Sequence, residues 1–74
     1  MRVIDTKKGN DGITYRIVDD ANPNYEYHDI IIEKLVKQDG TEFWIPLGVR
    51  FHEVDTAKKW FERLVNLNIN NQKV

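Results

Sequence analysis

An Asp-Gly pair at positions 39 and 40 stands between two apolar stretches and constrains the fold more than any other feature. A two-residue type I′ turn needs positive φ at both central residues, and Asp-Gly is one of the pairs that adopt it most readily. With Asp39 and Gly40 in those places, residues 28–51 form a single β-hairpin. The sequence therefore predicts a central hairpin about which the rest of the chain is organised.

This turn also sets the register of the hairpin. The predicted pairs are Gln38/Thr41, Lys37/Glu42, Val36/Phe43, Leu35/Trp44, Lys34/Ile45, Ile32/Leu47, Ile30/Val49, Asp29/Arg50 and His28/Phe51. The alternative is a three-residue loop with a glycine bulge, which slips the register by one residue and brings Glu33 opposite Ile45. We favour the two-residue turn because turn chemistry, apolar pattern and two opposite-charge pairs agree on it.

The length and composition indicate one small domain. The core of a 74-residue chain rarely supplies more than ~3–5 kcal/mol of folding stability, so most apolar side chains should be buried. The chain has no cysteine, which excludes disulfides and cysteine-ligated zinc and fits a reducing cytoplasm. We expect no signal segment and no membrane span. The net charge of −1 gives no general attraction to nucleic acid or anionic lipid.

Other strands are expected on the N-terminal side of the hairpin. Residues 2–5 are a short strand candidate, and residues 13–18 alternate apolar and polar side chains as a half-buried strand does. Residues 6–12 between them favour turns, so the two strands should form a first hairpin. A polar connector, residues 19–27, follows. Pro46 places the last strand at the sheet edge, because proline cannot donate to a ladder.

One amphipathic helix is expected after the strands. Asp55 is its candidate N-cap, and Phe61 in its apolar stripe should pack on residues 43–47. The stripe consists of Ala57, Phe61, Leu64 and Val65, flanked by Trp60 and Leu67. We predict an α+β domain over residues 1–68: a small antiparallel sheet of three or four strands, in the order β-β-β-β-α, with the C-terminal helix on one face. Residues 69–74 should form a frayed tail.

Two groups of side chains could carry chemistry, and each has a simpler explanation. His28 and His52 lie near the open end of the hairpin with carboxylates beside them, the minimum for acid–base work or a metal site. The chain has no Ser or Cys nucleophile, and we expect these histidines to cap the core. The connector carries oxygen ligands at Asp20, Asn22, Asn24 and Glu26, without the glycine and distal Glu of a calcium loop. We expect no catalytic residue, metal or cofactor.

The segment at residues 47–60 contains Leu47-Gly48, Phe51, Thr56-Ala57 and Trp60. In this pattern it resembles the end of plant AP2 domains and of integrase arm-binding domains. The resemblance implies DNA binding by the face of the sheet, which is our alternative function, although those domains are usually basic and this chain is not. The cations that would serve it are Arg16, Lys37, Arg50, Lys58, Lys59 and Arg63.

The hairpin face turned away from the helix gives the main functional expectation. It should carry an apolar cluster of Ile31, Leu35, Trp44 and Pro46 with a charged rim. A tryptophan anchor inside a charged rim is typical of protein interfaces. We expect a small non-enzymatic binding or accessory protein with a protein partner or a second copy of itself. The Asn and Lys content suggests a bacterial or phage origin.

Overall fold

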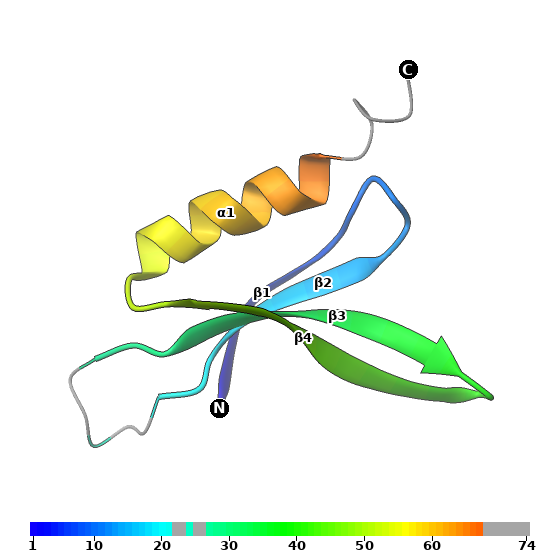
Figure 1. The fold of residues 1–74 in the computed structure, drawn as a ribbon, viewed down its shortest axis with the longest axis horizontal. Coiled ribbons are helices and arrows are strands. Elements are labelled where there is room, and N and C mark those ends of the chain that lie inside the picture. The colour runs from blue at the N-terminus through cyan, green and yellow to red at the C-terminus, as the bar shows by residue number, and fades with distance from the viewer. Residues whose placement is uncertain (22–23, 25–26, 68–74) are drawn as a thin grey trace.

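Two hairpins and one longer connector place four strands side by side (Figure 1). The fold is given by a computed structural model that describes residues 1–21, 24 and 27–67. The elements are β1 (Arg2–Lys8), β2 (Thr14–Asp19), β3 (Ile30–Gln38), β4 (Thr41–Phe51) and α1 (Val54–Asn66). All neighbouring strands are antiparallel, in the order β1-β2-β3-β4, and α1 lies across one face of this sheet. The α+β fold expected from the sequence is confirmed.

The central turn is of the predicted kind. Asp39 and Gly40 have φ of 53° and 80°, and Asp39 is the one non-glycine residue with positive φ among the described residues. The register follows the prediction from the turn as far as Glu33, which faces Pro46. Lys37 therefore faces Glu42, and the glycine-bulge alternative is excluded. Pro46 lies in an edge strand, as its missing N–H requires.

Beyond Pro46 the predicted register is wrong. Arg50 faces Ile31 rather than Asp29, and Phe51 faces Ile30 rather than His28. The cause is a bulge in β4 between Pro46 and Arg50, where Gly48 has φ of 85°. A Cβ atom added at Gly48 would have no other atom within 4 Å. The bulge adds two residues to β4 relative to β3. Because side chains alternate between the two sheet faces with a period of two, each residue of β4 after the bulge stays on its predicted face.

The core lies between α1 and the middle of the sheet. It consists of Tyr15, Ile17, Ile30, Ile32, Ala57, Phe61 and Val65. Phe61 is 1% exposed, as its central place in the apolar stripe predicts. The prediction that Phe61 packs on residues 43–47 is only partly confirmed, because Leu47 packs against the core while Phe43 is 37% exposed. The turn end of the β3–β4 hairpin projects beyond α1, which leaves Phe43 and Ile45 outside the core (Figure 1).

Three smaller predictions fail at element ends. β1 continues through Lys8, which pairs with Thr14 of β2, so the turn begins later than expected. The helix N-cap is Glu53 rather than Asp55, which lies in the first turn, and no side chain caps the helix. Arg50 contacts Asp29 through its side chain although the two are not register partners. The predicted tail at residues 69–74 lies outside the described residues.

Candidate functional site

The four residues expected to form an interface lie together on the sheet face opposite α1. We call Ile31, Leu35, Trp44 and Pro46 the outer hairpin face. Leu35 and Trp44 are register partners, and Pro46 faces Glu33 on the same side of the sheet. Ile31, Leu35 and Trp44 are half-buried and Pro46 is exposed. Among the described residues, no helix covers this face, and the four side chains keep part of their surface exposed, although Val18 beside Ile31 is fully buried.

An ion pair lies beneath one part of the outer hairpin face. Arg16 of β2 and Glu33 of β3 are register partners, and Arg16 Nε donates to Glu33 Oε1 at 2.7 Å. Both side chains are largely buried, with 16% and 11% exposed. The guanidinium carbon of Arg16 lies 4.2 Å from the centroid of the Trp44 ring, which is a cation–π contact. The Arg16 guanidinium thus covers one face of the Trp44 ring, a contact that the sequence did not predict.

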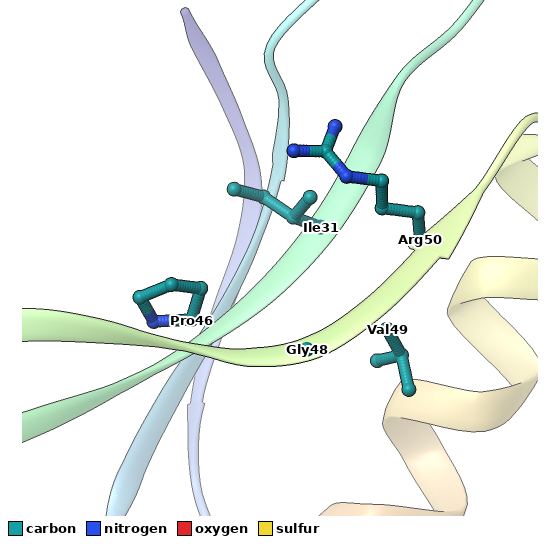
Figure 2. Close-up of a pocket in the computed structure, with 5 residues that line it drawn as sticks. All are labelled: Ile31, Pro46, Gly48, Val49 and Arg50. Carbon is teal, nitrogen blue, oxygen red and sulfur yellow. The ribbon is translucent and has the colours of Figure 1, made fainter.

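A hollow opens on the outer side of the sheet at the bulge of β4. It has a volume of about 370 Å³ and is lined by Ile31, Pro46, Gly48, Val49 and Arg50 (Figure 2). Ile31, Pro46 and Arg50 project to the same side of the ribbon, whereas Val49 points toward α1. Two of the four residues of the outer hairpin face therefore line a concave, mostly apolar surface. Gly48 and Val49 were not expected here, although a glycine two residues after a strand proline is a signal for a bulge.

The rim of the hollow is held by a second ion pair. Arg50 Nη1 donates to both carboxylate oxygens of Asp29, at 2.7 and 2.6 Å. This hydrogen bonding raises the pKa of Arg50 and keeps it charged at any physiological pH. Because the Arg50 side chain is 63% exposed, the pair contributes little to folding and chiefly fixes where the charge stands at the rim.

The cations named for nucleic-acid binding do not form one surface. Arg16 and Arg50 belong to the ion pairs with Glu33 and Asp29, and Lys37 faces Glu42 on the sheet. The other three, Lys58, Lys59 and Arg63, are exposed on α1, which packs on the opposite face of the sheet. A duplex lying on the sheet face would therefore meet two arginines whose charges are already balanced by carboxylates.

The histidines lie at the base of the connector. With its proton on Nδ1, His28 donates to Oδ2 of Asp19 at 2.7 Å, and His52 Nδ1 donates to the carbonyl oxygen of His28 at 3.1 Å. Asp19 also accepts backbone N–H bonds from Ala21 and Asp29. The hydrogen bond from His28, followed by these N–H bonds, lowers the pKa of Asp19. The cluster joins Asp19 at the end of β2 to His28 and Asp29, which precede β3, a structural role that adjacency in the sequence did not reveal.

Across residues 1–21, 24 and 27–67, no group of three or more metal-ligand side chains is placed to hold an ion. Asn22 and Glu26 of the acidic connector lie outside the described residues. Within the same ranges, no helix combines the length and apolar character needed to cross a bilayer.

Comparison with known protein families, curated proteins and solved structures finds no match for this chain. The resemblance of residues 47–60 to AP2 and integrase arm-binding domains therefore rests on those residues alone.

Proposed function

We propose that this chain is a small non-enzymatic accessory protein that binds another protein through the outer hairpin face. One observation carries the proposal: apolar side chains and an apolar hollow adjoin on the sheet face that α1 leaves open. A domain of this size needs most of its apolar surface for its own core. Apolar atoms left in contact with water give up about 25 cal/mol per Å² of burial, and a partner would recover that free energy.

The chemistry of the surface indicates what the partner presents. The hollow is of a size to accept an aliphatic or aromatic side chain, and Trp44 lies on the same face of the sheet, two residues before Pro46 in β4. At the rim, the charges of Asp29 and Arg50 are paired with each other, so a partner need not supply a charge there. The Arg16–Glu33 pair holds Trp44 in place before binding, which lowers the conformational entropy lost on association.

The cellular setting is part of the same proposal. The absence of cysteine supports action in a reducing cytoplasm, and the Asn and Lys content supports a bacterial or phage origin. No residue is proposed as catalytic.

The proposal is tested by a matched pair of charge substitutions. Pro46→Glu places a carboxylate on the outer hairpin face without removing a ladder hydrogen bond, because Pro46 has no N–H. The new carboxylate faces Glu33, so circular dichroism first checks that the variant is folded. Thr56→Glu places the same charge at an exposed position of α1, on the opposite side of the sheet. A protein captured from host extract by the immobilised chain is purified and titrated calorimetrically with the wild type and both variants.

We expect Pro46→Glu to weaken binding at least about tenfold and Thr56→Glu to leave it unchanged. Equal affinity for all three chains would place the interface elsewhere. Capture of DNA in place of protein, with affinity falling steeply as salt rises, would favour the alternative function.

A further inference from the structure

The outer edge of β4 is an unpaired strand edge in the described part of the chain, because β4 is the last strand of the sheet. In a hairpin closed by a two-residue turn, the pair next to the turn exchanges both backbone hydrogen bonds, and bonded and non-bonded pairs alternate from there. Gln38/Thr41 is that first bonded pair. Every second residue of β4 from Glu42 onward therefore directs its N–H and C=O away from β3, toward the open edge.

The open edge has a defined length. Glu42 and Trp44 each offer an N–H and a C=O, whereas Pro46 offers only a C=O and the bulge follows at once. Residues 41–45, Thr-Glu-Phe-Trp-Ile, have high β propensity and contain no proline, glycine or lysine. The four backbone groups of Glu42 and Trp44 thus stand ready to pair with one short strand, and the bulge prevents pairing beyond Pro46.

The other edge of the sheet is protected. β1 carries a bulge between Val3 and Asp5, which breaks the ladder near its start. Lys8 is exposed on this strand, and Lys7 is tied to Glu62 of α1. Bulges and lysines are the usual means by which proteins prevent an edge from pairing with another chain. Residues 41–45 lack both, so the turn half of β4 is the edge that is open to pairing.

We infer that two copies of this chain associate by pairing the turn halves of their β4 strands antiparallel about Phe43, which joins two sheets into one. In this register Glu42 of each copy faces Trp44 of the other, so the outward N–H and C=O groups of both residues are satisfied by four backbone hydrogen bonds. The edge is complementary to itself, and the occupant we assign to it is a second copy rather than an unrelated strand.

The side chains agree with this register. Phe43 faces the second copy's Phe43, and because Val36 pairs with Phe43 inside each hairpin, four apolar side chains form one row across the junction. Phe43 is 37% exposed in the single chain, so it has surface to bury. No like charges oppose each other, since Glu42 faces Trp44. The turn end of the hairpin projects away from α1, which leaves room for the second sheet (Figure 1).

A backbone test separates edge pairing from side-chain contact. Glu42→Pro removes an N–H that β3 does not use, whereas Glu42→Ala keeps it. Sedimentation equilibrium from about 1 µM to about 1 mM should show that the wild type and Glu42→Ala dimerise, with Glu42→Pro weaker by at least about tenfold. Circular dichroism checks that each variant is folded. A wild type that stays monomeric throughout, or a folded Glu42→Pro variant that dimerises normally, overturns the inference.

A second test does not depend on whether Glu42→Pro folds. Because Phe43 faces itself in this register, Phe43→Lys and Phe43→Glu should each abolish dimerisation by setting like charges opposite each other. Mixing the two variants should restore a dimer that contains one chain of each. If the mixture stays monomeric while the wild type dimerises, the register about Phe43 is wrong. Partner binding through Pro46 is measured separately, so either hypothesis can fail without the other.

Discussion

Phe61 is the side chain on which the fold depends most. It is 1% exposed and packs among Ile17, Ile30 and Ile32 of the sheet. Phe61→Ala should cost ~3–5 kcal/mol, because the cavity cannot collapse against a rigid sheet. That is about the whole stability expected of such a domain, so the variant should be largely unfolded at 25 °C. Thermal melts followed by circular dichroism provide the measurement. Leu67→Ala, at a position that is 52% exposed, should melt like the wild type.

The ion pair beneath Trp44 should behave as a buried pair rather than a surface one. Arg16→Met leaves the Glu33 carboxylate buried without its partner, which should cost ~3–5 kcal/mol. Adding Glu33→Leu removes that unpaired charge, so the double variant should be more stable than Arg16→Met alone. Urea unfolding of both variants, with Arg63→Met on the exposed helix face as control, tests this. If Arg16→Met lowers the free energy of unfolding no more than Arg63→Met does, the Arg16–Glu33 pair is effectively solvated.

Tyr15 makes stability depend on alkaline pH. Burial, assisted by its hydrogen bond to Asp11, raises the pKa of Tyr15 to about 12 from the ordinary 10.0. A pKa raised by folding gives stability that is fully present below the unfolded pKa and lost as pH rises toward the folded one. The unfolding free energy should therefore fall between pH 10 and about 12 by up to roughly 3 kcal/mol. Tyr15→Phe should remove most of this loss, whereas Tyr27→Phe should retain it in pH-dependent urea titrations.

At the scale of elements, the bulge in β4 decides where the hollow forms. Gly48 has φ of 85°, and a Cβ atom added there would have no other atom within 4 Å. A substitution at Gly48 is therefore disfavoured by the backbone conformation and not by steric crowding. Gly48→Ala should cost roughly 1–2 kcal/mol. Gly48→D-Ala, which prefers positive φ, should be at least as stable as the wild type. Melting temperatures of the synthetic chains measure both effects. Equal destabilisation by the two alanines would implicate crowding instead of backbone conformation.

The elements could be predicted where local chemistry determines them. Asp39-Gly40 specifies its own turn, and the alternation in residues 13–18 and the helical stripe each identify an element. The register beyond Pro46 could not be predicted in this way, because Pro46 and Gly48 signal a bulge but do not specify how many residues it adds. The extension of β1 to Lys8 likewise depends on how far its ladder with β2 continues, which the turn-rich residues 6–12 do not specify.

At the scale of the whole molecule, the sequence identified the residues of the outer hairpin face but not their surroundings. Alternation alone places Leu35 and Trp44 on that face. The contact of Arg16 with Glu33 and Trp44 exists only because β2 lies beside β3, which no local pattern specifies. For the same reason the list of candidate cations could not show that Arg16 and Arg50 are neutralised by partners.

The most direct test of the outer hairpin face uses the two tryptophans, which are the only ones in the chain. Trp44 lies on that face, whereas Trp60 belongs to α1 and packs against Phe51, with ring centroids 6.0 Å apart. The measurement is the pair of indole N–H resonances in an ¹⁵N-labelled chain, titrated with the purified protein partner. The proposal predicts that the Trp44 resonance shifts in proportion to the bound fraction while the Trp60 resonance stays in place. A shift of Trp60 with Trp44 unmoved would place the interface on the helix side and contradict it.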